Sequence, residues 1–384
     1  MKILAIETSC DETAISIVEG FGPIDKPQFT ILAQQVSSQI ALHAPFGGVV
    51  PSLAKREHGK NLVPILLSTL KEASLLHHEN IPLSYDRNQI STLLEREPDL
   101  LTNFNELLPS VSIPEIDLIA VTTGPGLEPA LWVGVNFARA LSLIWDKPAL
   151  GINHMEGHIV SPLLVEGATI NFPALALLIS GGHTELVLVN EGFHYQKIGQ
   201  TRDDAVGEAF DKVARLLDLP YPGGPQISKL AQLAREKNLS HADWSFPRPM
   251  IHSSDFDFSF SGIKTAVLYA IQKKGSLTDE QKMTLAREFE DAVIEVLLKK
   301  TLTAIDEYQI ETLIIGGGVI ANQTLRTAFE TTLHADHPHV KLLIPEFTHA
   351  TDNASMIAAA AYIRQFSEIS TTNPKLEATG NTSL

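Results

Sequence analysis

The chain alternates between short apolar runs and polar stretches, a pattern that predicts both strands and helices. Four of the runs form two pairs, each joined by a polar turn as in a β-hairpin: residues 3–6 with 14–18, and 174–179 with 186–189. The turns are related to each other, because an offset of 171 residues places Ser180 on Ser9 and Thr184 on Thr13. The repeated hairpin predicts two related lobes.

Longer stretches carry apolar residues at helical spacing and predict helices between and after the hairpins. They cover residues 61–72, 133–144, 205–217, 227–236, 285–308 and 354–366. A buried-type strand at 118–121 ends in a glycine turn, and another at 313–315 runs into glycines before a helix that begins near Asn322. Because strands and helices alternate, the sequence predicts an α/β fold.

The two hairpins divide the chain into an N-terminal lobe over 1–150 and a C-terminal lobe over 151–350. We expect residues 351–369 to form a closing helix that returns to the N-terminal lobe. Residues 83–114 are polar and irregular, which indicates a surface excursion with short helical pieces. The tail 370–384 is polar enough to predict disorder.

Length and composition favour a soluble, enzyme-sized protein. With 384 residues and 44% hydrophobic content, the chain can bury a large core. No stretch approaches the roughly 18 consecutive apolar residues of a membrane span, and the start does not read as a signal peptide. The single cysteine, Cys10, excludes an internal disulfide, so we expect a cytoplasmic protein.

The formal net charge of -16 opposes nucleic-acid binding by the chain alone, since such binding neutralises phosphates with basic side chains. The candidate basic residues are scattered, as ordinary solvated surface residues are: Lys55, Arg56, Lys212, Arg215, Arg248 and Lys264. A basic partner subunit would therefore help to bind any RNA substrate.

His154 and His158 form the first candidate site, because histidines four residues apart share one helix face and can bind one metal ion. The pair alone fits surface or helix-capping histidines better. A zinc peptidase would need a glutamate directly after the first histidine, whereas Glu156 comes one residue later and points to the opposite face. Proteolysis is therefore disfavoured.

Two aspartates each allow two interpretations. Asp352 precedes an alanine-rich helix, where it could act as the N-cap. Asp211 shares an acidic helix face with Asp204 and Glu208, which is typical of a solvated face. Carboxylates on such a face could instead accept hydrogen bonds from ribose hydroxyls. The residues alone do not choose between these roles.

Glycine turns could approach a nucleotide closely. Residues 180–184 form a turn whose backbone amides can bind phosphate, although such hairpin turns are common. The counterpart turn carries Asp11 and Glu12, which repel phosphate unless a metal or water intervenes. Residues 316–322 could pass close to a base or ribose; tight packing, with Asn322 as an N-cap, is the equal alternative.

Taken together, these segments resemble the tRNA threonylcarbamoyladenosine transferase family, TsaD, also called Gcp or O-sialoglycoprotein endopeptidase. The resemblance covers most of the chain. It is carried by the segments 6–13 (IETSCDET), 43–51, 124–127 (GPGL), 154–158 (HMEGH), 180–184 (SGGHT), 207–212, 221–225, 246–249, 257–265 (DFSFSGIKT), 316–322 and 351–353. Chance rarely produces so many motifs in one order.

The resemblance implies a two-lobed actin-like ATPase fold with duplicated lobes, shared with sugar kinases and heat-shock ATPases. It implies a metal, Fe(II) favoured and Zn(II) possible, held by His154, His158 and Asp352. It also implies contacts with an adenylate: its phosphate region with Leu178, Ile179, Ser180, Gly181 and Gly182, and its nucleoside with Asp211, Gly224 and Asn322. Asp11 is our candidate catalytic acid.

The activity implied is transfer of a threonylcarbamoyl group from threonylcarbamoyl-AMP to the adenosine 3' of the anticodon, in tRNAs that read codons beginning with A. The partners implied are a paralogous subunit, TsaB, and a small ATPase, TsaE. The chain departs from the family pattern at 128–129, 153, 354–355 and in the excursion. None of these is a proposed ligand, so the departures concern partner docking and lineage more than the reaction.

Two other functions stay open at this point. A non-catalytic subunit of the same fold would have no reason to bring His154, His158 and Asp352 together, so metal analysis separates it from an enzyme. A kinase-like enzyme acting on a sugar or a carbamoyl compound would turn over ATP rapidly by itself. The proposed transferase would instead depend on a prepared adenylate.

Overall fold

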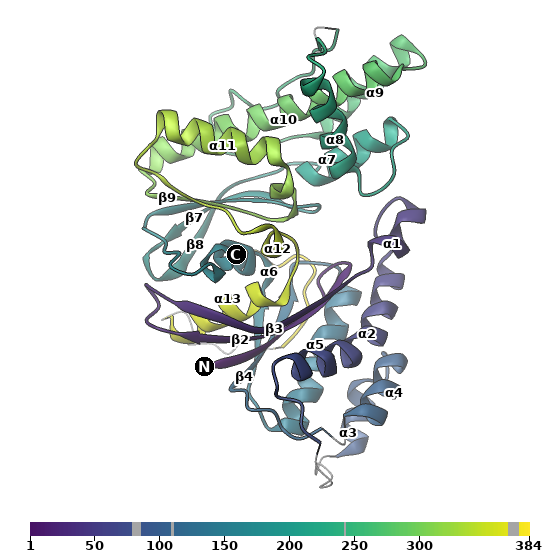
Figure 1. The fold of residues 1–384 in the computed structure, drawn as a ribbon, viewed down its shortest axis with the longest axis vertical. Coiled ribbons are helices and arrows are strands. Elements are labelled where there is room, and N and C mark those ends of the chain that lie inside the picture. The colour runs from purple at the N-terminus through teal and green to yellow at the C-terminus, as the bar shows by residue number, and fades with distance from the viewer. Residues whose placement is uncertain (79–85, 109–110, 242, 368–375) are drawn as a thin grey trace. The chain divides into compact units, whose positions relative to one another are not determined.

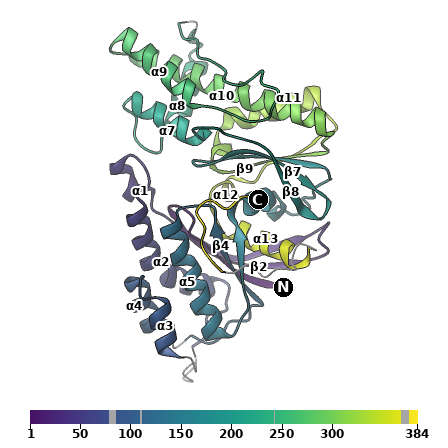
Figure 2. The same cartoon turned by 180° about the vertical axis from the view of Figure 1, so that it is seen from behind.

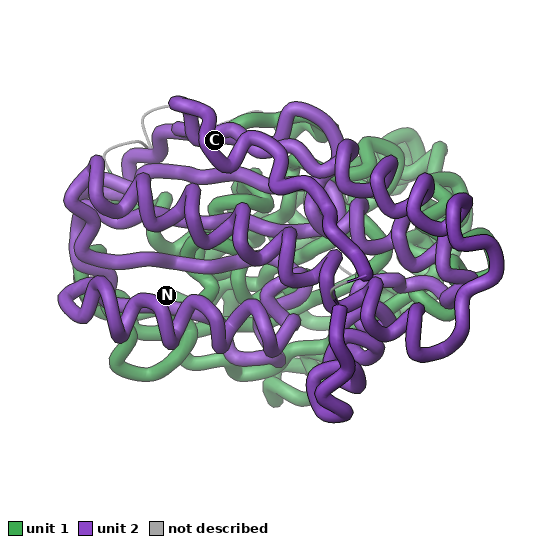
Figure 3. Tube along the Cα trace, turned by 90° about the horizontal axis from the view of Figure 1, so that it is seen from above, with its two compact units in different colours: residues 1–169, 352–384 green, residues 170–351 purple. Residues whose placement is uncertain are grey.

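The computed structural model describes residues 1–78, 86–108, 111–241, 243–367 and 376–384. The chain divides into two compact units, coloured separately in Figure 3: unit 1 comprises Met1–Thr169 and Asp352–Leu384, and unit 2 comprises Ile170–Thr351. The first boundary lies after Thr169, later than residue 150, where the sequence placed it. The chain therefore enters unit 2 once and returns to unit 1 at Asp352.

Unit 1 is built on a five-stranded sheet with the order β3-β2-β1-β4-β5. Its strands are β1 (Lys2–Glu7), β2 (Glu12–Phe21), β3 (Gln28–Ser38), β4 (Leu118–Gly124) and β5 (Ala149–Asn153). The first three strands pair antiparallel, whereas β4 and β5 extend the sheet in parallel. β1 lies in the middle and is buried on both faces, which explains its nearly unbroken apolar run. The predicted first hairpin is confirmed.

Helices cover both faces of this sheet, as Figures 1 and 2 show. The helices α2 (Pro51–Glu72) and α5 (Glu128–Trp145) pack together on one face, around Leu4 and Ile6 of β1. On the other face lies α13 (Ala354–Phe366), whose Ser355 hydroxyl donates to that of Ser16 at 3.0 Å. The alternation of side chains along the strands thus supplies two apolar surfaces.

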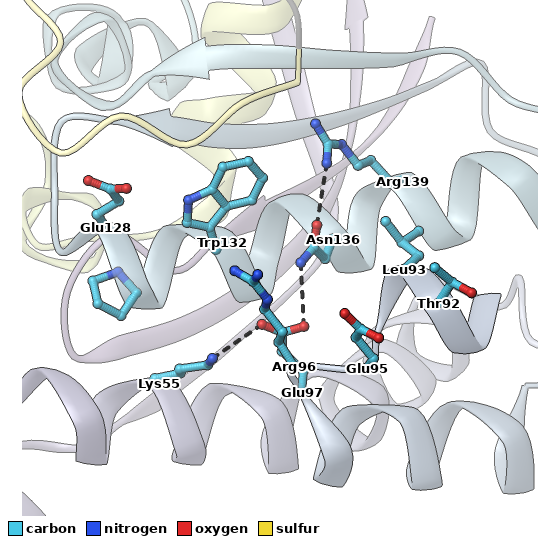
Figure 4. Close-up of a pocket in the computed structure, with 11 residues that line it drawn as sticks. Lys55, Thr92, Leu93, Glu95, Arg96, Glu97, Glu128, Trp132, Asn136 and Arg139 are labelled. Carbon is cyan, nitrogen blue, oxygen red and sulfur yellow. Dashed lines mark hydrogen bonds and ion pairs between the residues drawn. The ribbon is translucent and has the colours of Figure 1, made fainter. Parts of the chain in front are cut away.

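Further helices of unit 1 connect these layers: α1 (Ile40–His43), η1 (Ala44–Phe46), α3 (Arg87–Leu93), α4 (Pro98–Leu107), α6 (His154–Val160) and η2 (Ser161–Leu164). Of these, α3 and α4 lie in the predicted excursion, of which 83–85 and 109–110 fall outside the described residues. A pocket of about 740 Å³ separates the α3–α4 connection from α5 (Figure 4). Buried Glu97 pairs there with Lys55 at 3.4 Å and accepts a hydrogen bond from Asn136 at 3.4 Å. This network anchors the excursion on α2 and α5.

Residues 376–384 lie along the end of β4. The amide of Thr379 donates to the carbonyl of Thr123 at 2.8 Å, and the amide of Gly126 donates to the carbonyl of Gly380 at 3.1 Å. Ala378, directly before Thr379, is buried. Of the tail expected to be disordered, 370–375 fall outside the described residues, and 376–384 are instead fixed by these backbone hydrogen bonds. A polar segment is ordered when its backbone groups find partners.

Unit 2 repeats the topology of unit 1. Its strands are β6 (Ala174–Ile179), β7 (Thr184–Asn190), β8 (His194–Gln200), β9 (Thr312–Gly316) and β10 (Lys341–Leu343), in the order β10-β9-β6-β7-β8. As in unit 1, the first three strands are antiparallel and the last two extend the sheet in parallel. Each strand has a counterpart of the same order and direction in the other sheet. The second hairpin and the two related lobes are confirmed.

The helices of unit 2 are η3 (Glu191–Phe193), α7 (Val206–Leu216), α8 (Gly223–Glu236), α9 (Ser261–Lys274), α10 (Asp279–Tyr308), η4 (Gly318–Ala321), α11 (Gln323–Asp336) and α12 (Phe347–Ala350). A capping box of Thr278 and Gln281 starts α10, which with α11 covers one face of the sheet (Figure 1). Within the described residues, no helix combines the length and apolar character that crossing a bilayer requires.

Candidate metal centre and nucleotide-binding loops

His154 and His158 project from α6, which begins where β5 ends. Asn153 caps this helix by accepting a hydrogen bond from the amide of Met155 at 2.8 Å. The spacing places both imidazoles on one face, with ring centroids 4.6 Å apart. Both side chains are buried, with 6% and 1% of their surface exposed. The interpretation as surface histidines is therefore wrong.

Asp352 reaches this pair because α13 packs closely against α6. A Cβ on Gly157 would lie 3.0 Å from side-chain atoms of Ile357 and Met356, so a larger residue there would require these side chains to shift by a few tenths of an ångström. The side chain of Asn353, not that of Asp352, caps α13 by accepting a hydrogen bond from the amide of Met356 at 3.0 Å. The N-cap interpretation of Asp352 is wrong, and its carboxylate faces the histidines instead.

The three side chains present a compact triangle of donor atoms. Oδ1 of Asp352 lies 3.5 Å from Nε2 of His154 and 3.2 Å from Nε2 of His158, and the two nitrogens are 3.1 Å apart. Ligands about 2.1 Å from one ion are separated by roughly 3.0 Å at right angles and roughly 3.4 Å at tetrahedral angles. The triangle therefore fits a divalent metal ion. In the described part of the chain, no second cluster of this kind occurs.

Glu7, which the sequence analysis missed, orients one of the histidines. Its Oε2 lies 3.0 Å from Nδ1 of His154 and accepts a hydrogen bond from Thr122 at 2.6 Å, while Oε1 accepts from the amide of Ser9 at 2.5 Å. A carboxylate at Nδ1 holds the proton there and leaves the Nε2 lone pair for a metal. The signal in the sequence was an acid that ends a buried strand.

Charge at the cluster favours a cation. Burial lowers the pKa of His154, but the carboxylates of Asp352 and Glu7 outweigh burial and raise it well above its usual value. Burial raises the pKa of Asp352, yet the two histidines lower it overall. Burial, followed by the charges of Asp352 and Asp11, raises the pKa of Glu12 to about 9. A metal ion would relieve this excess of negative charge.

The raised pKa of His154 predicts how metal binding depends on pH. Ligation requires the neutral imidazole, so binding must expel the proton that His154 holds in the metal-free protein. Affinity for Zn²⁺ should rise about tenfold per pH unit below the raised pKa. Calorimetry between pH 6.0 and 7.5, in buffers of different ionisation enthalpy, measures the protons released. An affinity independent of pH, with no proton released, would contradict this assignment.

Asp11 lies in the loop that joins β1 to β2. Its side chain is buried, and its carbonyl accepts a hydrogen bond from the amide of Gln39 at 2.9 Å. Ser9, in the same loop, has its hydroxyl 3.3 Å from Nδ1 of His154, so the acidic loop lies close to the metal cluster. The catalytic assignment of Asp11 stays a prediction.

The turn at Ser180 differs in part from the open amides that the sequence suggested. The hydroxyl of Ser180 accepts hydrogen bonds from the amides of Gly182 at 3.3 Å and His183 at 3.0 Å. Leu178 and Ile179 are fully buried in β6. A Cβ on Gly207 would lie 2.6 Å from the carbonyl of Ser180, so α7 starts tightly against this turn. By contrast, a Cβ added to Gly181 or Gly182 would meet no atom within 4 Å, so the turn is open on that side.

The predicted acidic face separates into two parts, and Asp204 lies just before α7. Asp204 and Glu208 pair with Lys212 at 2.7 Å and 3.0 Å. Asp211 instead accepts hydrogen bonds from the amides of Gly223, at 2.7 Å, and Gly224 at the start of α8. Burial raises the pKa of Asp211, although these amides oppose the shift.

Asn322 caps α11, since its Oδ1 accepts a hydrogen bond from the amide of Leu325 at 2.9 Å. Its amide group donates to Ser228 of α8 at 2.8 Å and to Glu290 of α10 at 2.7 Å. The N-cap interpretation is confirmed, and it is compatible with a second role. Because Asp211 and Asn322 both contact the first turns of α8, the structure brings these candidates to one region of unit 2.

The chain matches the family model of TsaD, described as tRNA N6-adenosine threonylcarbamoyltransferase, over residues 30–79 and 100–359. A protein named tRNA N6-adenosine threonylcarbamoyltransferase, from Paraburkholderia xenovorans (strain LB400), is 40% identical over 366 residues. The alignment covers 95% of this chain and 92% of that protein. The matched ranges omit 80–99, which contain α3 and part of the pocket in Figure 4.

Among solved structures, full-length HypF in its phosphate- and nucleotide-bound form is similar, with a TM-score of 0.54 and 12% identity. The similarity covers 99% of this chain and 47% of the HypF chain. At this identity it shows the fold alone, and it confirms the predicted actin-like ATPase architecture. The family match, the relative and the fold agree, and the chain therefore belongs to the TsaD family of tRNA N6-adenosine threonylcarbamoyltransferases.

Proposed function

We propose that this chain transfers the threonylcarbamoyl group of threonylcarbamoyl-AMP to the adenosine 3' of the anticodon, in tRNAs that read codons beginning with A. We further propose that the transfer depends on a metal held by His154, His158 and Asp352. The observation that carries the proposal is the compact triangle of their donor atoms, with both histidines buried, in a member of this family. Two imidazoles and one carboxylate suit Fe(II), which we favour, or Zn(II).

The metal, when bound, supplies Lewis acidity toward the carbamoyl carbonyl. The chain's own residues prepare that position. Glu7 keeps the proton on Nδ1 of His154, so that Nε2 faces the site as a donor. Asp352 contributes a negative charge and lies next to both imidazoles. Apolar packing of α6 and α13 buries the histidines and keeps their rings in place.

The nucleophile in this proposal is the exocyclic amine of adenosine. Its lone pair is delocalised into the ring, so positioning and activation of the carbonyl matter more than a strong base. The bond from the amine nitrogen to the carbamoyl carbon forms, the bond from that carbon to the phosphate oxygen breaks, and AMP leaves. We assign Asp11 as the group that takes the amine proton or orients a water, because it lies in the acidic loop close to the cluster.

Unit 2 is proposed to hold the adenylate. Gly181 and Gly182 leave open the space that a Cβ would occupy, and a phosphate can approach the turn there. Leu178, Ile179 and Ser180 support that turn from the end of β6. Asp211 and Asn322 contact the first turns of α8, which include Gly224, and together the three residues offer carboxylate, amide and carbonyl groups to a nucleoside.

The net charge of -16 makes a basic partner useful for binding tRNA. We propose a TsaB-like paralogous subunit and a TsaE-like small ATPase as partners, in the cytoplasm. The anticodon loop is the part of tRNA whose bases can leave the stack and enter a pocket.

Reconstitution tests this function. The full chain, loaded with Fe(II) or Zn(II), is mixed with synthetic threonylcarbamoyl-AMP, unmodified tRNA and the candidate partners, and modified nucleosides are measured by mass spectrometry. We expect threonylcarbamoyladenosine to form without added ATP. Rapid ATP consumption by the chain alone, without tRNA modification, would support a kinase-like enzyme instead. Absence of modification under every metal and partner combination would refute the proposal.

A further inference from the structure

A chain of hydrogen bonds between buried side chains links the loop after β1 to the start of α2. His58, in the second turn of α2, lies 2.8 Å from the hydroxyl of Thr13 through Nδ1 and 3.0 Å from the carbonyl of Cys10 through Nε2. The side-chain nitrogen of Gln39 lies 3.4 Å from Nδ1 of His58, and its side-chain oxygen lies 3.2 Å from Nε2 of His43. All four side chains, Thr13, Gln39, His43 and His58, are at most 1% exposed.

The partners fix where the protons lie. The Cys10 carbonyl only accepts, so Nε2 of His58 donates to it and Nδ1 accepts from Thr13. The amide of Val50 donates to Nδ1 of His43 at 3.2 Å, so Nε2 of His43 donates to the Gln39 carbonyl oxygen. Both imidazoles are therefore neutral. This agrees with burial, which lowers the pKa of His58 to about 4.

These bonds hold the acidic loop at both ends. His58 binds the backbone of Cys10 and the side chain of Thr13, and the amide of Gln39 binds the carbonyl of Asp11 between them. The preceding residue, Ser9, has its hydroxyl 3.3 Å from Nδ1 of His154. The place of the loop beside the metal cluster is therefore set from α2, a helix of 22 residues.

We propose that His58 is a positioning residue: through its two ring nitrogens it fixes the loop that carries Asp11 and Glu12 next to the metal cluster. His58 acts on the site only through the loop. Substituting His58 should therefore change the turnover number more than the binding of threonylcarbamoyl-AMP. The effect on transfer rests on the proposed function, whereas the effect on the loop does not.

Cys10 is the natural probe, because it is the only cysteine of the chain and its own carbonyl receives the bond from His58. We compare the rate at which an aromatic disulfide reagent modifies Cys10 in the wild type, His58→Leu and His58→Gln. Leucine keeps the volume without a hydrogen bond, and glutamine restores a donor and an acceptor. We expect roughly tenfold faster modification in His58→Leu, since a buried hydrogen bond is lost, and a return to within about threefold in His58→Gln.

Transfer kinetics give a second readout: kcat should fall about tenfold or more in His58→Leu, with the KM for threonylcarbamoyl-AMP changed less than threefold. The exposed His77 serves as the control, and His77→Leu should match the wild type in both assays. If His58→Leu does not fold, Thr13→Val removes one partner of His58 at nearly constant volume and should also speed modification of Cys10.

Two results would overturn the inference. One is Cys10 reactivity within twofold of the wild type in both His58→Leu and Thr13→Val; the other is a glutamine variant no better than the leucine variant. If the wild type shows no transfer activity, only the proposed function is refuted. The rate of Cys10 modification would still show whether His58 fixes the loop.

Discussion

Replacing His154 with alanine should abolish metal binding and lower threonylcarbamoyl transfer by about 10³-fold or more. In the wild type, Nε2 of His154 lies 3.1 Å from Nε2 of His158 and 3.5 Å from Oδ1 of Asp352. The variant keeps the other two donor atoms but lacks this third ligand. Activation of a carbonyl by a metal contributes several kcal/mol, which corresponds to a rate change of this order. Elemental analysis of the purified protein and single-turnover transfer assays measure the two losses.

The fold of His154→Ala should survive, since α6 and α13 keep their apolar contacts at Gly157. Removing the imidazole leaves the buried carboxylate of Glu7 without its partner, so a clear loss of thermal stability is expected. His77→Ala is the matched control, because His77 is an exposed histidine of the same unit. Full tRNA modification by His154→Ala would refute the metal role.

Glu7→Gln should weaken metal binding about 10- to 100-fold while leaving all three ligands in place. Partners that hold the distal nitrogen of a ligating histidine typically contribute this much to affinity. Glutamine keeps nearly the same shape, but it loses the charge that holds the proton on Nδ1 of His154. Competition with a chelator of known Zn²⁺ affinity measures the change.

Glu156→Gln is the control for this experiment. Glu156 lies on α6 with the two histidines, yet its carboxylate pairs with Arg364 at 3.7 Å, away from the cluster. The variant should bind Zn²⁺ as the wild type does. Equal losses of affinity in Glu7→Gln and Glu156→Gln would mean that the effect comes from overall charge and not from the orientation of His154.

Local patterns along the chain predicted much of the fold. The central strands β1 and β6 are buried on both faces and read as apolar runs, so both hairpins and their repetition were visible. The edge strands β3 and β8 were missed, because an edge strand is partly solvated and carries many polar residues. Likewise, the polar segment 376–384 gave no sign that β4 would provide partners for its backbone.

The candidate site was predictable only in its local part. His154 and His158 stand four residues apart on one helix, so their shared face follows from helical geometry alone. Asp352 looked equally like a helix cap, and the choice between cap and ligand depended on Asn353, which provides the cap. Glu7 gave a weak signal, an acid at the end of a buried strand, and its partner lies 147 residues further along the chain.

By itself, the sequence determined the duplicated α/β plan, the histidine pair and the resemblance to a tRNA-modifying family, because these depend on short-range periodicity and on motif order. Only the tertiary structure decided which distant groups meet. Asp352 follows the whole of unit 2 and returns to the histidines through the packing of α13 on α6. His58 reaches the Cys10 loop in the same way, from α2. Contacts of this kind are set by side-chain packing between elements, which periodicity along one chain does not encode.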